Sequence, residues 1–411
     1  MEHHAGSGKK ISLGILRETK DPPDKRVPLT PSQCRELKER YPALEILVQP
    51  SGNRCFSDEE YLKAGMRIKE ELDDCQVLMG VKEVEPGTLM DEKTYYFFSH
   101  TAKMQPYNRG LLQSVIQHGI TLVDYEYLTR ENRERVVAFG RWAGIVGAYN
   151  GLRAYGLRSG NYALKPASGC RDLQELLRET GKVVLNGCRI LVTGGGRVAG
   201  GALEILQAVR VQEVTPESYL TGKNQGAIFT RLDPWHYTRR SGGKPFEFEH
   251  FVAHPDEYEN NIHPYALRTD MLVACHFWDP RSPVMLNRQF LADASNPIRV
   301  IADISCDING PIASTIRAST IADPFYGYEA DSGSETGPFE SGSITVMAVD
   351  NLPGELPRDA SADFGSALVQ HVIPEMLGMR QSGMIERATI AANGTLTQAF
   401  GYLKNYLRGK E

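Results

Sequence analysis

The feature that most constrains the fold is a glycine-rich turn between an apolar strand and a helix. The segment "CRILVTGGGRVAGGALEILQAV" begins with aliphatic residues, passes through Gly194 and Gly196, and ends in a helical pattern. In this arrangement glycines let backbone N–H groups approach a pyrophosphate at the helix N-terminus. The spacing Gly194-x-Gly196-x-x-Ala199 therefore predicts a dinucleotide-binding turn, because alanine is an accepted variant in the third place.

The residues of this turn are our candidates for contacts with the cofactor. They are Gly194, Gly196, Arg197, Val198 and Ala199. An acid that holds the ribose hydroxyls is expected about 20 residues further on, and Glu213 lies there. The strand "VQEV" is too short to fix which side chain points at the ribose, so we expect NAD and leave NADP open. A turn needed only for packing is the alternative.

Composition narrows the class of protein. A chain of 411 residues is too long for one core, so we expect two domains. The formal net charge of −5 gives no global basic field, which argues against a nucleic-acid or membrane partner. The seven cysteines show no metal-ligand spacing, which predicts reduced thiols, a cytoplasmic location and no metal site. We interpret "MEHHAGSGKK" as an N-terminal lead without the apolar core of a signal peptide, with His3 and His4 inert.

Strand and helix patterns alternate along the first 140 residues. "ISLGILRE", "LEILVQP", "CQVLMGV", "YYFFS" and "ITLVDYEYL" read as strands, and helices start at Thr30–Pro31 and after Ser57. A long helix, "FGRWAGIVGAYNGLRAYGLRSG", and a polar insertion over roughly residues 216–269 follow. The fold class we expect is α/β, with two Rossmann-like domains, parallel sheets and a cleft between them. Residues 11–140 plus 350–411 are the expected substrate and catalytic domain, and 141–349 the nucleotide-binding domain.

Titratable side chains follow several of these predicted strands. Lys82 ends "CQVLMGV", and His100 and Lys103 come directly after "YYFFS". Asp124 and Glu126 should share one face of the strand "ITLVDYEYL", because side chains alternate along a strand. Since parallel sheets place their sites at the carboxyl ends of strands, we expect these groups to gather at one edge.

Several motifs together resemble a known superfamily. "ETKDPPDKRVPLTP", "GVKE" and "FFSHTAK" occur in that order before a Rossmann unit near residue 190. The chain resembles the alanine dehydrogenase/transhydrogenase superfamily and, more closely, the saccharopine-forming and saccharopine-cleaving dehydrogenases within it. The pair His100 and Lys103, and the ending "LPRDAS" with Arg358, favour the saccharopine branch.

The resemblance implies an NAD-dependent oxidoreductase that interconverts saccharopine with lysine and 2-oxoglutarate. Lys82 would take the proton of the secondary amine, and His100 would activate the water that attacks the imine. A substrate with three carboxylates calls for several cations and one acid. The candidate substrate-binding residues are Lys20, Arg26, Lys103, Glu126 and Arg135, with Asp124 second to Glu126.

By the same resemblance Asp350, Asn351 and Leu352 would lie near the nicotinamide, and Asp307 could face it. The expected partners are small-molecule substrates only. An alanine-dehydrogenase-like activity, an inactive NAD-binding sensor and a lysine analogue as amine donor stay open. So do the direction of the reaction and the oligomeric state.

Overall fold

The chain forms two compact units. The computed structural model describes residues 11–20, 22, 24–222 and 226–410. Unit 1 comprises Met1–Ala138 and Pro357–Glu411, and unit 2 comprises Phe139–Leu356. The N-terminal lead with His3 and His4 lies outside the described residues.

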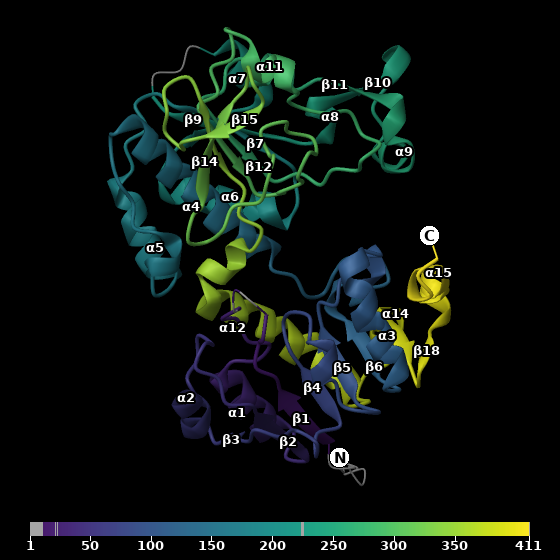
Figure 1. Ribbon diagram of the computed structural model, residues 1–411. Helices are drawn as coiled ribbons and strands as arrows, with labels where there is room; N and C mark the ends of the chain where they lie inside the picture. Colours follow the sequence, from purple (N-terminus) through teal and green to yellow (C-terminus); the bar gives the residue numbers. More distant parts are fainter. Residues whose placement is uncertain (1–10, 21, 23, 223–225, 411) are drawn as a thin grey trace, which may run out of the picture. The chain divides into compact units, whose positions relative to one another are not determined.

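Unit 1 is built on an eight-stranded sheet (Figure 1). Its strands, from one edge to the other, are β3 (Arg67–Ile68), β2 (Leu44–Val48), β1 (Ile11–Ile15), β4 (Val77–Met79), β5 (Thr94–Phe97), β6 (Thr121–Asp124), β17 (Thr389–Ala392) and β18 (Thr395–Leu396). The first six are parallel, and β17 and β18 form an antiparallel hairpin beside β6. The parallel sheet confirms the sequence prediction, whereas the C-terminal hairpin was not predicted.

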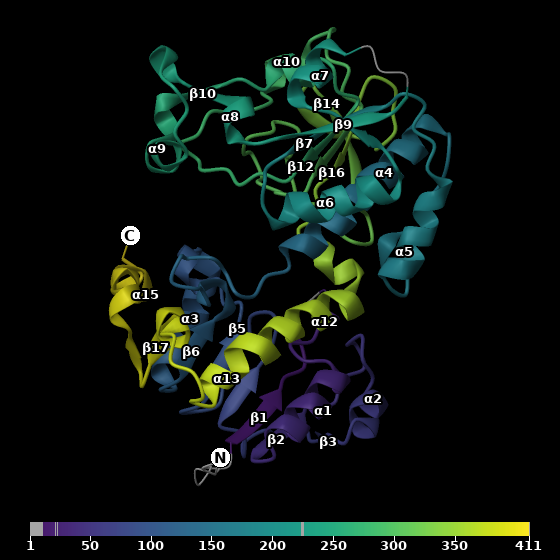
Figure 2. The ribbon, with the colours of Figure 1, turned by 180° about the vertical axis from the view of Figure 1, so that it is seen from behind.

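Helices cover both faces of this sheet. They are α1 (Pro31–Arg40), α2 (Asp58–Lys63), α3 (Arg109–Gln117), α12 (Pro357–Ala367), α13 (Ile373–Met376), α14 (Met384–Ala388) and α15 (Lys404–Leu407). Thr30 and Ser57 form the predicted N-terminal caps of α1 and α2, each within a capping box that satisfies two backbone donors. Helix α12 continues through a π-helical turn (Leu368–Val372) into α13, and the run lies across one face of the sheet (Figure 2).

Unit 2 holds a second eight-stranded sheet. Its order is β8 (Gln212–Glu213), β9 (Ile228–Leu232), β7 (Arg189–Thr193), β12 (Met271–Ala274), β13 (Val300–Asp303), β16 (Ile344–Met347), β14 (Phe325–Glu329) and β15 (Ser334–Thr336). Again six strands are parallel and the last two form an antiparallel hairpin. Strand β7, which precedes the glycine-rich turn, therefore lies near the middle of the sheet.

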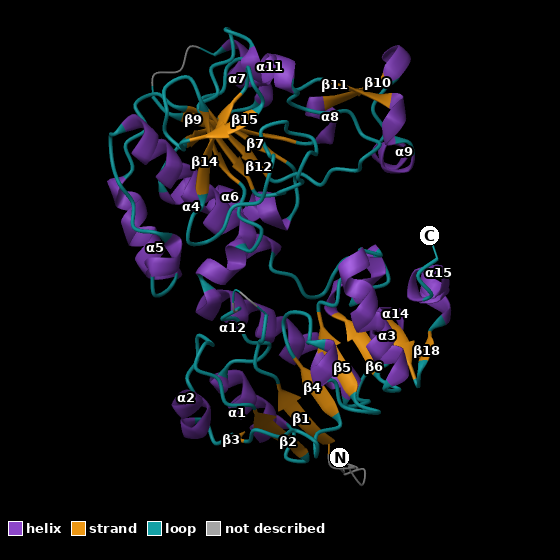
Figure 3. Cartoon of the chain, viewed as in Figure 1, coloured by secondary structure: helices purple, strands orange, loops and turns teal. Residues whose placement is uncertain are grey.

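The helices of unit 2 are α4 (Gly140–Ser159), α5 (Leu173–Glu179), α6 (Arg197–Ala208), α7 (Pro216–Thr221), α8 (Pro234–Tyr237), α9 (Phe248–Ala253), α10 (His263–Ala266) and α11 (Arg288–Ala292). The predicted long helix is confirmed as α4. The segment expected to be a polar insertion contains β9, a core strand with buried Phe229 and Leu232. Only its later part departs from the sheet, where β10 (Thr238–Arg240) and β11 (Tyr258–Asn260) pair as a separate ribbon (Figure 3).

Helices α4 and α6 cross at unusually close range. A Cβ atom on Gly144 would collide with the carbonyl oxygen of Val198, and one on Gly201 with that of Arg141. Only glycine fits at these two positions, so the backbone of α6 is held directly against that of α4. Among the described helices, none combines the length and hydropathy that a membrane span requires.

Candidate active site

The carboxyl edge of the unit 1 sheet gathers most of the residues predicted for catalysis and substrate binding. Strand β4 brings Lys82 and Glu83, strand β5 brings His100 and Lys103, and strand β6 leads to Glu126. With Lys20, which follows β1, and Arg135, these residues are called the charged edge below. Their positions follow from the parallel pairing of β1, β4, β5 and β6, which aligns the ends of these strands.

The surroundings of Lys82 favour the neutral form of its amine. Burial, and next the positive charge of Arg26, lower the pKa of Lys82. Its ammonium forms no ion pair or hydrogen bond with any residue that the structure describes. A lysine of this kind can carry a free lone pair closer to neutral pH.

Glu18 supports this lysine and was not singled out from the sequence. Its carboxylate accepts hydrogen bonds from the backbone N–H groups of Val81 (2.6 Å) and Lys82 (2.9 Å). Burial nevertheless raises the pKa of Glu18 to about 7. Glu18 and Lys82, with Glu83, line a pocket of about 90 Å³. The signal available in the sequence was an acid directly after strand β1, at the same edge as Lys82.

His100 is oriented by an acid. Its Nδ1 lies 2.5 Å from Oε1 of Glu83, and the second oxygen of Glu83 accepts from Lys20 at 3.1 Å. Burial alone would raise the pKa of Glu83, but the hydrogen bond and charge of His100, together with smaller contributions, hold it at about 2. Because an ionised Glu83 only accepts, Nδ1 of His100 carries the proton of this bond, and Nε2 is the ring nitrogen that remains for another partner.

The backbone at His100 is in an uncommon conformation. Its φ of 51° lies in the left-handed region, where a residue with a Cβ is strained. A 3-10 turn over Thr101–Lys103 starts directly after it. The turn places the side chain of His100 against Glu83 and that of Lys103 against Glu126. The strain is thus located at a residue predicted to be functional.

Glu126 is shared by two cations. Arg135 donates to it at 2.7 Å, and the Nζ of Lys103 lies 3.5 Å from its other oxygen. Three of the predicted substrate-binding residues therefore form one cluster. Side chains of Lys103 and Arg135 are about half exposed, and that of Glu126 is mostly buried.

The prediction that Asp124 and Glu126 share a strand face is wrong. Strand β6 ends at Asp124, and a 3-10 turn follows over Tyr125–Tyr127. The cause is Asp124 itself, whose buried carboxylate accepts from the backbone N–H of Glu126 and from the N–H and hydroxyl of Ser99. Asp124 thus connects the turn that carries Glu126 to the end of β5. Because its carboxylate is used in these hydrogen bonds, Asp124 supports the site and does not bind substrate in our interpretation.

Arg26 is buried and paired. Its Nε and Nη2 donate to the two oxygens of Asp24 at 3.0 and 2.6 Å. A substrate carboxylate at Arg26 would share the guanidinium with Asp24. The charge of Arg26 acts on Lys82, so the residue belongs to the same neighbourhood.

The glycine-rich turn of unit 2 has the geometry that a dinucleotide turn requires. Gly194 has a φ of 97°, and a Cβ there would lie 2.7 Å from the carbonyl oxygen of Cys275. Gly196 is the N-cap of α6, has no side-chain cap, and faces open space. The first N–H groups of the helix are therefore available to an anion.

Glu213 does not reach this turn. It lies on the edge strand β8, beyond β9, and is paired with Phe229, three residues before the end of β9. The strand next to β7 is β9, although β8 follows α6 in the sequence. Counting residues from the glycines therefore selects the wrong strand.

The acid beside the glycine turn is Asp233. It follows the last residue of β9, and a Cβ on Gly195 would meet its carboxylate. Arg231 donates to both oxygens of Asp233, at 2.9 and 3.0 Å. The available signal was the apolar run "AIFTRL" followed by "DP", a strand that ends on an acid.

His276 lies on the other side of the turn and has an unused nitrogen. Its Nδ1 bonds with the hydroxyl of Thr193 at 2.7 Å, and burial lowers its pKa to about 4. The buried Nε2 has no hydrogen-bond partner among the described residues. A neutral, buried nitrogen beside a glycine turn fits a polar ligand such as a nucleotide.

The remaining predicted cofactor contacts lie on loops at the same edge of the sheet. Asp307 follows β13, and Asp350 and Asn351 follow β16, both strands parallel to β7. Leu352 differs, because its side chain is buried in unit 2 close to α4. Any contact of Leu352 with a cofactor would involve its backbone.

The chain is similar to several known proteins. Residues 14–146 match the family model "Alanine dehydrogenase/PNT, N-terminal domain". The chain is 30% identical, over 95% of its length, to an "Alpha-aminoadipic semialdehyde synthase" of Arabidopsis thaliana, but spans only 41% of that protein. It is 26% identical to a "Saccharopine dehydrogenase [NAD(+), L-lysine-forming]" of Emericella nidulans, over 90% of this chain and 92% of that one.

A solved L-alanine dehydrogenase has a similar fold, with a TM-score of 0.67 and 17% identity over 97% of this chain and 99% of that one. At this identity the likeness concerns the fold alone. The family model and the curated relatives confirm the superfamily resemblance predicted from the motifs.

Proposed function

Because the chain is a homologue of the saccharopine dehydrogenases, within the alanine dehydrogenase/transhydrogenase superfamily, we propose that it interconverts saccharopine with L-lysine and 2-oxoglutarate. The observation that carries this proposal is the charged edge of unit 1. It combines a lysine with a lowered pKa, an acid-oriented histidine and further cations. In this scheme unit 1 supplies the acid–base groups and unit 2 binds the cofactor.

Lys82 acts first in the oxidative direction. Its neutral amine accepts the proton of the secondary amine of saccharopine, which frees the nitrogen lone pair as the α-carbon loses hydride. The product is an imine between lysine and 2-oxoglutarate. When bound, a nicotinamide dinucleotide would supply the acceptor for this hydride. Burial of Lys82 and the absence of an ion-pair partner within the described part of the chain support this role.

His100 acts on the imine. Its Nε2 accepts a proton from the attacking water, while Nδ1 stays bound to Glu83. The carbinolamine then breaks its C–N bond as the amine takes up a proton, which releases lysine and 2-oxoglutarate. The reverse sequence uses the same groups, so the direction depends on concentrations in the cell.

The cations of the charged edge suit the carboxylates of the substrate. Lys20, Lys103 and Arg135 are each held by Glu83 or Glu126 and keep about half of their side-chain surface exposed. They can therefore bind a carboxylate of the substrate while each keeps its own ion pair, so that no charged group is buried without a partner. Glu126 is placed by the same cluster to accept from an ammonium group of the substrate.

The cofactor we propose is NAD. The turn Gly194–Gly196 and the N-terminus of α6 would hold the pyrophosphate, and Asp233 would accept from the ribose hydroxyls. Asp233 replaces Glu213 in this role because it adjoins Gly195. Arg231 is the residue that would favour the 2′-phosphate of NADP if its bond with Asp233 opened.

Initial-rate assays test the proposal. Oxidation of NADH and of NADPH is followed with lysine plus 2-oxoglutarate, and separately with pyruvate plus ammonia. We expect activity in the first set, with NADH preferred. Activity only in the second set would show an alanine dehydrogenase. Cofactor binding with no turnover in either set would show a binding protein.

A further inference from the structure

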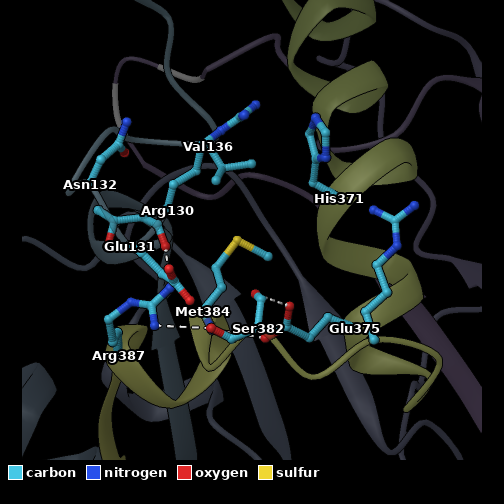
Figure 4. Close-up of a pocket in the computed structure, with 11 residues that line it drawn as sticks. Arg130, Glu131, Asn132, Val136, His371, Glu375, Ser382, Met384 and Arg387 are labelled. Atoms are coloured by element: carbon cyan, nitrogen blue, oxygen red, sulfur yellow. Dashed lines mark hydrogen bonds between the residues drawn. The ribbon is translucent and has the colours of Figure 1, made fainter.

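A second polar pocket in unit 1 is distinct from the charged edge. It has a volume of about 440 Å³ and lies between the loop that carries Arg130 and Val136, the helical run that carries His371, and α14 with the turn before it. Figure 4 shows Arg130 and His371 on opposite sides of this space, with Met384 between them. None of the residues predicted for catalysis or substrate binding lines it.

Three arginines line this arginine pocket: Arg130, Arg380 and Arg387. Arg387 donates to the backbone carbonyls of Ser382 and Thr129, and Arg380 to that of Gln370. The guanidinium of Arg130 has no hydrogen bond within the described residues. No carboxylate of the described chain forms an ion pair with any of the three. Three unneutralised guanidiniums around one cavity repel one another until an anion enters.

Two acids, Glu375 and Glu131, also line the pocket and offset only part of this charge. The carboxylate of Glu375 is already used, because Ser382 Oγ and the N–H groups of Met384 and Ile385 donate to it. It thereby satisfies donors at the N-terminus of α14. Glu131 is exposed on the rim.

Two further observations favour an anion as the ligand of this pocket. The Nε of Arg387 is buried and has no acceptor in the part of the chain that the structure describes. Burial, and then the charges of Arg130 and Arg380, lower the pKa of His371, which lines the same pocket. A buried donor without an acceptor is costly, and a ligand oxygen would satisfy it.

We propose that the arginine pocket binds a small oxyanion with at least two negative charges, a di- or tricarboxylate or a phosphate. Planar guanidiniums match both groups through paired N–H donors. The volume falls in the range of small-molecule sites. Val136 and Met384 add apolar surface for the carbon skeleton of an organic acid. The site lies apart from the catalytic groups, so its ligand acts as an effector or a structural anion.

The loop of the pocket is connected to the charged edge. Arg130 and Val136 flank the segment that contains Arg135, which donates to Glu126. On the opposite side of the pocket, the helical run that carries His371 continues from α12. Phe364 of α12 packs against Tyr125, with ring centroids 5.1 Å apart. An anion that orders this loop would thus act on a predicted substrate-binding residue.

Isothermal titration of the intact chain with citrate and with inorganic phosphate tests the proposal. The double variant Arg130→Ala/Arg380→Ala removes the two arginines that have the fewest structural contacts. We expect saturable binding of at least one probe to wild type and about 10-fold weaker binding to the double variant, since each arginine supplies charge-assisted hydrogen bonds. Saturation by citrate alone identifies a carboxylate site, and saturation by phosphate alone a phosphate site.

Arg35→Ala is the matched control, because Arg35 is exposed on α1 and lies outside the pocket. It should bind the probes as wild type does. Absence of saturable binding to wild type overturns the proposal, and so does equal binding by the double variant. Circular dichroism and cofactor binding verify that the double variant is folded. A citrate signal that persists in the double variant but disappears in Arg26→Ala belongs to the substrate site and counts against the proposal.

Discussion

The two units share one sheet plan and differ in what they place at its carboxyl edge. Each large sheet has six parallel strands and an antiparallel hairpin at one side. In unit 1 the edge carries charged side chains, with Lys82, His100 and Glu126 within it. In unit 2 the centre of the corresponding edge is formed by the glycines Gly194–Gly196, which have no side chains. One edge is suited to acid–base chemistry and the other to close backbone contact with a nucleotide.

The sheets also differ in the order of their first three strands. In unit 1 the strand after β1 is its neighbour, β2, and β3 lies outside. In unit 2 the strand after β7 is the outer one, β8, and β9 returns to pair with β7. The exchange decides which acid adjoins the glycine turn. The following experiments test the division of labour between the two edges.

The largest effect is expected at the charged edge of unit 1. Lys82→Met and His100→Gln should each lower turnover by about 10²–10⁴-fold, because each removes a proton-transfer group. Steady-state kinetics with saccharopine measure the loss, and titration of NADH fluorescence should show that cofactor binding is retained. Lys63→Met, an exposed change on α2, should leave both unchanged. Near wild-type rates in both variants would remove these residues from the mechanism.

The next effect is on the stability of unit 2. Gly201→Val places a side chain where the carbonyl of Arg141 lies, and we expect a loss of about 1–3 kcal/mol in the free energy of unfolding. Gly200→Ala is the matched control, because a Cβ there meets nothing within 4 Å. It should be neutral or stabilising, since alanine favours the helix. Equal denaturation midpoints for the two variants would contradict the close crossing of α4 and α6.

A smaller effect, on the affinity for NADH, distinguishes the two acids that could bind the ribose hydroxyls, Asp233 and Glu213. Asp233→Asn should weaken NADH binding by roughly 10-fold, because hydrogen bonds to a charged group contribute about 1.5–3 kcal/mol. Glu213→Gln should leave NADH binding unchanged. Fluorescence titration gives both constants. If Glu213→Gln weakened NADH binding and Asp233→Asn did not, Glu213 would be the acid that binds the ribose, and Asp233 at the end of β9 would not.

The smallest effect is a dependence of stability on pH. Burial raises the pKa of Glu18 from 4.5 to about 7 in the folded chain. The folded state therefore binds more protons than the unfolded state in this interval, and the free energy of unfolding falls as the pH rises from 4.5 to 7. Glu18→Gln should reduce this fall, and exposed Glu39→Gln should not. Parallel slopes for Glu18→Gln and wild type would show that the carboxylate is not desolvated.

Local patterns predicted most of the elements. The caps at Thr30 and Ser57, helix α4 and the strand–turn–helix structure of the glycine turn depend on neighbouring residues, and these structures are confirmed. Strand order was not accessible in this way, because the pairing of β9 with β7 joins residues about 40 positions apart. The hairpin β17–β18 was missed for a different reason, because its signal is local: the turn Asn393–Gly394 between its two short strands was overlooked.

The candidate site was predictable in type and only partly in detail. The charged residues after β4 and β5 follow directly from the ends of apolar runs. The turn at Glu126 was not predictable from alternation, because Asp124 bonds the backbone and ends the strand. Glu18 and Asp233 were missed because their importance depends on neighbours from other strands. The catalytic and binding roles of all these residues stay predictions until the variants are measured.

The close crossing of helices α4 and α6 at Gly144 and Gly201 has a consequence for redesign of the protein. Helix α6 is fixed to α4 through backbone atoms, so substitutions on it have little freedom to reshape the nucleotide turn without a penalty in stability. The Arg231–Asp233 pair sits on the opposite side of the turn, on a strand end outside this crossing. A change of coenzyme preference, in the laboratory or in evolution, is therefore expected to begin at the end of β9.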